Sequence, residues 1–332
     1  MMLFKTQILE MLGADSDTIA YASQYYTFIV HGCTFIIFSM VPINLMRTVG
    51  HPNASMIASI LGAVINIILD PIFIFALGLG AAGAAIATII GYICSSAFAV
   101  YYVGSKCEGL SMKLSDFGLE KGEVGKILAV GLPASVTNFT QTLGLALTNR
   151  NLSVYGSDKV ATMNVVIKVV YIVMLVAIGL AFGGQPLIGY VYGSGNKERL
   201  KKVLAFAYKI VPGTALVMAA VVAILSRPIV MFFFKEENLI KMGTLMLRLQ
   251  MPGMVLMGVG LVTICTFQSM GKGLPALLLS ICRQGVVYAA VITILSYAFG
   301  YMGVISSQFV SDIFSVIIAG VLFMVFIKPE LK

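Results

Sequence analysis

The stretch NIILDPIFIF, residues 66–75, places one carboxylate, Asp70, inside a long apolar run. No charged residue lies between Met56 and Leu69, and none follows Asp70 until Lys106. An apolar run of about 20 residues is long enough to cross the hydrocarbon core of a bilayer as a helix. A carboxylate at that depth costs roughly 3 kcal/mol on insertion scales. The stretch therefore predicts a membrane helix whose carboxylate has a function.

The rest of the chain has the same apolar character. Of its 332 residues 59% are hydrophobic and 11% are charged, whereas soluble domains have about 25% charged residues. We therefore expect an all-α polytopic membrane protein that lies in a lipid bilayer. Nine apolar ranges are candidate spans: 17–46, 54–77, 83–103, 126–152, 160–191, 202–226, 241–269, 275–299 and 303–327.

The net charge of +8 reflects membrane orientation and does not indicate a nucleic-acid partner. The basic residues gather in short loops between the apolar runs, above all in GSGNKERLKK, residues 193–202. Cytoplasmic loops of membrane proteins carry such an excess of Lys and Arg. We therefore place this loop in the cytoplasm, and alternation of the spans places GLGAAG, residues 78–83, on the opposite side.

Enzyme and metal-site patterns are weak in this sequence. GLGAAG lies between two predicted spans and lacks the strand-turn-helix context of a dinucleotide site. The chain has two histidines, and its five cysteines show no spacing typical of metal ligands. We therefore expect a protein that is not an enzyme and has no cofactor.

An internal repeat predicts the architecture. Residues 45–88 align with 266–308, so that Gly50 pairs with Gly271, Ser59 with Ser280 and, after one gap, Gly80 with Gly300. Both copies have the same orientation because six spans separate equivalent helices, which predicts a parallel repeat about an axis along the membrane normal.

The two copies differ in what precedes them. The second follows three predicted spans and the first follows none, so we expect nine helices of an original twelve. The predicted parts are a remainder of a first lobe, a cytoplasmic linker and a second lobe, at residues 1–103, 104–125 and 126–332.

The first half offers a polar cluster around Asp70. Residues four apart share one face of a helix, and on the span at 54–77 this face is small and polar: Ala58, Gly62, Asn66 and Asp70. The next span presents Gly80, Ala84, Thr88, Gly91 and Ser95. Small faces let two helices approach closely, so we expect Asn66, Asp70 and Thr88 to converge. Alternatively, Asp70 caps a helix break at Pro71, with Asn66 as an interhelical hydrogen-bond partner.

The second half has other polar residues within its spans. The candidates for a substrate cavity are Asn138, Gln141, Asn149, Lys168 and Gln185. Asn138 and Gln141 fit a contact between helices equally well. Val291 occupies the repeat position of Asp70, and we interpret Asp312 as a residue at a helix end.

Several motifs resemble those of the multidrug and toxic compound extrusion (MATE) transporters, in particular the bacterial DinF-like and MepA-like branch. They are NIILDPIFIF with GLGAAGAAIAT (78–88), GLPASVTNFTQTLGLALTN (131–149), GGQPLIGYVYGSGNKERLKK (183–202), LMRTVGHP (45–52) and FQSMGKG (267–273). The resemblance implies twelve helices in two lobes, of which this chain resembles helices 4 to 12 and is N-terminally truncated. It also implies a multi-pass protein of the cytoplasmic membrane that exports small amphipathic, often cationic drugs in exchange for H⁺ or Na⁺, and we expect a monomer.

The resemblance also implies which residues exchange the ion. The family's Asn and Asp of helix 5 and Thr of helix 6 match Asn66, Asp70 and Thr88, so Asp70 is the expected site of H⁺ or Na⁺. The carboxylate that the family has on helix 1 is absent here, and the acidic pair that some members have in the second lobe is not evident.

The predicted function is a secondary active multidrug antiporter that works by alternating access. One alternative is a lipid-linked oligosaccharide flippase of the same superfamily, which needs a more cationic cavity than Lys168 and Arg150 supply. The other is a remnant that does not transport.

Overall fold

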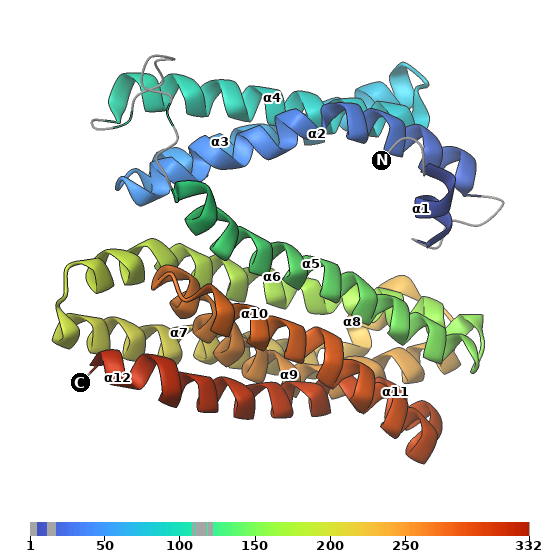
Figure 1. Cartoon of the computed structure of the whole chain (residues 1–332). Helices are drawn as coiled ribbons and strands as arrows, with labels where there is room; N and C mark the ends of the chain where they lie inside the picture. The colour runs from blue at the N-terminus through green and yellow to red at the C-terminus, as the bar shows by residue number, and fades with distance from the viewer. Residues whose placement is uncertain (1–4, 12–17, 108–109, 111–117, 119–121, 332) are drawn as a thin grey trace. The chain divides into compact units, whose positions relative to one another are not determined.

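Figure 1 shows a computed structural model of the chain, which describes residues 5–11, 18–107, 110, 118 and 122–331. Every regular element in these residues is a helix, as the apolar runs predicted. The chain forms two compact units, Met1–Gly118 and Leu119–Lys332. The predicted linker at 104–125 falls mostly outside the described residues, and the predicted lobe boundaries stay predictions.

In the first unit three long helices lie side by side (Figure 1). Helix α4 packs against both α2 and α3, and the short α1 contacts α2. The chain remains helical through Pro71 and continues into the π-helical turn η2, so no helix break exists there for Asp70 to cap. The bounds are α1 (Lys5–Met11), α2 (Ile19–Thr48), α3 (Pro52–Pro71), η2 (Ile72–Ala76) and α4 (Gly80–Lys106).

The seam between α3 and α4 consists of the two small faces expected from the sequence. A Cβ atom on Gly91 would lie 2.6 Å from the carbonyl oxygen of Gly62. One turn further, the Ser95 hydroxyl donates a hydrogen bond of 2.7 Å to the Ala58 carbonyl. These contacts confirm the predicted close approach of the two helices.

The second unit is built around one buried helix, α9, which packs against α6, α7, α8, α10 and α11. Most residues of α9 from Met246 to Phe267 are buried. The bounds are α5 (Glu123–Ser153), α6 (Ser157–Gly193), α7 (Lys197–Ile224), α8 (Ser226–Phe233), α9 (Glu237–Ser269), α10 (Gly273–Ile281), η4 (Cys282–Val286, π-helical), α11 (Val287–Leu322), η5 (Phe323–Ile327, π-helical) and α12 (Lys328–Leu331).

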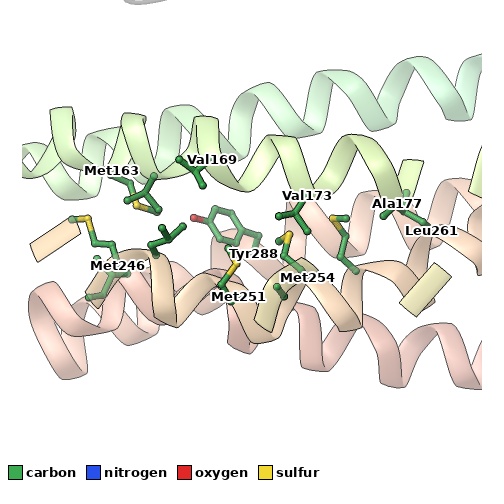
Figure 2. Packing of buried hydrophobic residues seen from close by; sticks show 14 of the residues in the cluster. Met163, Val169, Val173, Ala177, Met246, Met251, Met254, Leu261 and Tyr288 are labelled. Atoms are coloured by element: carbon green, nitrogen blue, oxygen red, sulfur yellow. The ribbon is translucent and has the colours of Figure 1, made fainter. Parts of the chain in front are cut away.

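The core of the second unit is rich in methionine. Figure 2 shows Met251, Met254 and Tyr288 lying between α6 and the helices below it. Methionine is unbranched and flexible, and it fills irregular gaps between helices. The valines on α6, among them Val169 and Val173, form the facing wall.

Glycines with positive φ support the internal repeat at the level of local backbone. Gly50 and its repeat partner Gly271 have φ of 90° and 70°, and Gly80 and its partner Gly300 have φ of 53° and 56°. Side chains other than glycine rarely adopt such values. Both copies therefore turn their chain at the same aligned positions. The axis that relates the two copies stays a prediction.

Seven helices of the described residues are long and apolar enough to cross a membrane. Helix α11 joins parts of two predicted spans, 275–299 and 303–327, across a kink at Gly300, where φ is 56° and ψ is −133°. Within the described residues, each of the nine ranges predicted from hydropathy lies mostly on helical residues.

Candidate functional site

The three residues predicted to converge in the first unit are joined by hydrogen bonds. The Nδ2 atom of Asn66 donates to Oδ1 of Asp70 and to Oγ1 of Thr88, at 3.3 Å in both cases. The Thr88 hydroxyl donates in turn to the Ala84 carbonyl at 2.9 Å. Asn66 thus uses both N–H groups to link the carboxylate of α3 to the hydroxyl of α4.

This arrangement leaves oxygen atoms available for a cation or a proton. The Thr88 hydroxyl donates to a backbone carbonyl, so its oxygen faces Asn66 as an acceptor. All three side chains are half-buried. Carboxylate, amide carbonyl and hydroxyl oxygens are ligands that suit hard cations. The cluster is therefore chemically able to hold either a proton on Asp70 or a small cation beside it.

A cavity of about 460 Å³ adjoins this cluster within the first unit. Asn66 and Thr88 line it, whereas Asp70 lies beyond Asn66, one helical turn away. Arg47 contributes the one charged side chain of the lining and donates a hydrogen bond of 3.4 Å to the Ser55 hydroxyl. The other lining residues come from α2, α3 and α4: Ser39, Met40, Ile43, Asn44, Ser59, Gly62, Ala63, Gly91, Tyr92 and Ser95.

The second unit contains two neighbouring cavities of about 100 and 230 Å³, which share the lining residues Gln141, Met174 and Arg283. Nε2 of Gln141 donates to the Tyr171 hydroxyl at 3.0 Å. The smaller cavity is further lined by Gly144, Leu145, Thr148, Met163, Ile167, Val170, Tyr171, Gln250, Met254, Met257, Tyr288 and Gln308. The larger is further lined by Asn138, Ile178, Phe182, Leu261, Ile264, Gln268 and Ser280.

The structure brings two of the five predicted cavity residues, Asn138 and Gln141, to these cavities. The other three lie elsewhere. The Lys168 side chain is exposed on α6. Asn149 has a buried Oδ1 atom without a hydrogen-bond partner among the described residues, and Gln185 donates to Gln268 at 3.3 Å. Their assignment to a substrate cavity stays a prediction.

The interpretation of Asp312 as a helix-end residue is wrong. Asp312 lies inside α11, is 1% exposed, and accepts a hydrogen bond of 3.2 Å from Nε of Arg283. Arg283 is 7% exposed. A buried charge needs a partner of opposite charge close by. Here Arg283 and Asp312 are partners of each other.

Arg283 was not among the residues predicted for a site, although the sequence contains a signal for it. Arg283 falls inside the predicted span 275–299, and a charged residue within a span is a functional candidate by default. The sequence does not indicate its partner, because Arg283 and Asp312 are 29 residues apart and lie on different predicted spans.

Comparisons with known proteins agree with the fold and with these motifs. The MatE family model matches residues 1–72 and 133–294. The multidrug export protein MepA of Staphylococcus haemolyticus is 30% identical over 93% of this chain and 68% of its own length. MepA of Staphylococcus saprophyticus is 30% identical over 94% of this chain and 69% of its own length.

Solved structures are similar over nearly the whole chain. A MATE crystal structure in the straight conformation matches with a TM-score of 0.91 and 25% identity, covering 99% of this chain and 74% of that one. A MOP superfamily transporter from Pyrococcus furiosus Vc1 matches with a TM-score of 0.91 and 26% identity over the same shares. The chain is a polytopic membrane protein that belongs to the MATE family.

Proposed function

We propose that this protein is a multidrug efflux transporter in which Asp70 exchanges a cation, H⁺ or Na⁺, for the drug. The observation that carries the proposal is the hydrogen-bonded set of Asp70, Asn66 and Thr88 on the seam between α3 and α4. Relatives similar over most of the chain are named multidrug export proteins, which supports the substrate class.

The chemistry of coupling follows from the energetics of a carboxylate inside a membrane. Charged Asp70 is costly in an apolar bundle unless a cation or hydrogen-bond donors balance it. Loading with H⁺ or Na⁺ removes that cost, and release restores it. A ligand shifts a conformational equilibrium only through its differential affinity for the two states. Occupancy of Asp70 therefore biases the transporter toward the state in which its charge is balanced.

The test is efflux of ethidium from proteoliposomes that contain the 332-residue chain, under an imposed H⁺ or Na⁺ gradient. We expect gradient-driven efflux by the wild type and its loss in Asp70→Asn, which keeps the size and hydrogen-bonding shape of the side chain but cannot exchange charge. Asp158→Asn is the matched control, because Asp158 lies exposed in the first turn of α6.

Three outcomes decide between the alternatives. Wild-type efflux in Asp70→Asn would make Asp70 a structural residue only. Absence of efflux by the wild-type chain under both gradients would favour a chain that does not transport by itself. The gradient that drives efflux identifies the coupling ion.

The flippase alternative is less well supported by the charges of the two cavities that share Gln141. Among its described residues Arg283 is the one cationic side chain that lines the two cavities sharing Gln141, and Asp312 neutralises it. Lys168 and Arg150, the two cations considered for that function, are both exposed. A pyrophosphate carries more charge than this site balances.

A further inference from the structure

Arg283 is held by a single hydrogen bond to its counter-ion. Its Nε donates to Oδ1 of Asp312 at 3.2 Å, and the same oxygen accepts from Nε2 of Gln308 at 3.3 Å. Within the described part of the chain no hydrogen bond links the two terminal nitrogens of the guanidinium to another residue. The second carboxylate oxygen, Oδ2 of Asp312, is buried without a partner among the same residues.

This geometry is unusual for a buried arginine and carboxylate. The guanidinium is always charged and presents five N–H donors, and it pairs best with a carboxylate through two parallel hydrogen bonds. Here the pair is joined through one nitrogen only. Arg283 is 7% exposed, yet it lines both of the cavities that share Gln141. Its two terminal nitrogens are therefore the donors that remain for a molecule in those cavities.

The backbone holds Arg283 in this position. Arg283 lies in the π-helical turn η4, and its carbonyl accepts a hydrogen bond of 3.1 Å from the Ser311 hydroxyl. Single π-helical turns inside helices occur frequently at functional sites. Oδ2 of Asp312 lies against α9 at Gly253, where an added Cβ would be 3.0 Å away. Contacts with α9 and α11 thus fix both ends of the ion pair.

The internal repeat shows that the ion pair is not required by the packing of these helices. In the repeat alignment Arg283 corresponds to Gly62 and Gln308 to Thr88. In the first unit Gly62 packs directly against the backbone of Gly91 and the Ser95 side chain. A buried ion pair contributes little or nothing to stability compared with apolar packing. Arg283 and Asp312 therefore call for a functional explanation.

The cavities around Arg283 combine one polar end with an apolar wall. Gln141 and Gln308 lie with Arg283 at the polar end, and Met174, Met254 and Met257 contribute to the wall. Met254 and Tyr288, which Figure 2 shows facing α6, also line the smaller cavity. Methionine walls adapt to ligands of different outline. Such a site suits a ligand that has a flat apolar part and a group that accepts hydrogen bonds from a guanidinium.

We propose that the second unit binds the acidic group of amphipathic compounds, a carboxylate or a sulfonate, through the terminal nitrogens of Arg283. The inference deepens the proposed function, on which it rests for the view that the bound compound is cargo. It adds acidic compounds to the substrates of the transporter.

Asp312 competes with the ligand for the same guanidinium. A bound anion and the Asp312 carboxylate would both pair with the Arg283 guanidinium, and two negative charges beside the same guanidinium repel each other. Removal of the Asp312 charge should therefore strengthen binding of an anion, whereas removal of the Arg283 charge should abolish it. A purely structural ion pair predicts no change in anion binding for either substitution beyond that caused by unfolding.

The test is equilibrium dialysis of tritiated 2-naphthoate and of its neutral counterpart 2-naphthamide against the 332-residue chain in phosphatidylcholine nanodiscs. Empty nanodiscs give the lipid background. The wild type is expected to bind naphthoate saturably and at least tenfold more tightly than the amide. Arg283→Gln is expected to lower naphthoate affinity to that for the amide, and Asp312→Asn to raise naphthoate affinity severalfold.

Two further variants separate binding from folding. Loss of one partner of a buried ion pair destabilises a protein strongly. The double variant Arg283→Gln with Asp312→Asn contains no buried charge at this site, so it should fold and bind naphthoate no better than the amide. Arg248→Gln is the control, because Arg248 is exposed on α9 and donates to Ser226 at 2.9 Å, away from these cavities. Its naphthoate affinity should equal that of the wild type.

Two results would overturn the proposal, and neither depends on whether a variant with one substitution folds. Equal affinity of the wild type for naphthoate and naphthamide would refute it, and so would undiminished naphthoate binding by the folded double variant. Naphthoate binding without ethidium efflux by the wild type would refute the proposed transport and leave the anion site. Ethidium efflux together with equal affinity for naphthoate and naphthamide would refute the anion site and leave the proposed transport.

Discussion

Gly62 on α3 and Gly91 on α4 meet through their backbones. A Cβ atom on Gly91 would lie 2.6 Å from the carbonyl oxygen of Gly62 and 3.3 Å from the Cβ of Asn66. The absence of side chains at this contact lets the two helices approach closely. The same approach brings Asn66 within hydrogen-bond reach of Thr88. The glycine contact is thus the packing feature that assembles the candidate cation site.

Gly91→Ala should destabilise the protein by about 1–3 kcal/mol, the usual cost of overpacking a well-packed contact. The added methyl group would push α4 away from the Gly62 carbonyl. Denaturant or thermal unfolding in detergent measures the change. Gly104→Ala is the matched control, because Gly104 also lies on α4 but has no atom within 4 Å of an added Cβ. Equal stability of the two variants would contradict a tight seam.

Thr88→Val should weaken cation coupling while leaving the fold intact. Valine has nearly the shape of threonine but cannot accept the hydrogen bond from Asn66, so the amide loses one of its two partners. A net hydrogen bond contributes about 1 kcal/mol, which corresponds to roughly a fivefold rise in the cation concentration for half-maximal ethidium efflux. Thr88→Ser retains the hydroxyl and should resemble the wild type. A valine variant with unchanged cation dependence would remove Thr88 from the site.

Gly300→Ala should destabilise the protein by about 1–3 kcal/mol, the typical cost of a non-glycine residue in a sparsely populated backbone region. At this bend of α11 the backbone has φ of 56° and ψ of −133°. Gly320→Ala, on the regular and open part of α11, should instead be neutral or slightly stabilising, because alanine favours helix. Unfolding curves of the two variants check this prediction, and the opposite order would show that the bend is dispensable.

Membrane orientation gives a fourth prediction, based on the charge of the loops. In a cysteine-free background, a membrane-impermeant maleimide added outside the cell should label Leu79→Cys and not Ser194→Cys. Leu79 is preferable to Gly80 for this purpose, because Gly80 has φ of 53° and a cysteine there would be strained. Labelling of Ser194→Cys alone would reverse the assigned orientation.

The helices could be predicted from the amino-acid sequence, because their cause is local. A chain in lipid must satisfy every backbone hydrogen bond within the membrane, so apolar runs of sufficient length become helices. Small residues four apart on one helix also belong to a single face whatever surrounds it. The seam of Gly62 with Gly91 and the cluster at Asp70 followed from these two rules, and the aligned glycines revealed the repeat.

The contacts between side chains of distant helices could not be predicted in this way, because they depend on how the helices pack. Arg283 pairs with Asp312 across 29 residues, and the Thr148 and Tyr288 hydroxyls are bonded across 140. Hydropathy is nearly the same on every side of these helices, so it does not show which face is turned toward a neighbour. Packing also kept the chain helical through Pro71. It left Lys168 exposed, outside the two cavities that share Gln141. The anion site at Arg283 therefore depends on how the helices pack, whereas the helices themselves depend on the sequence of each segment.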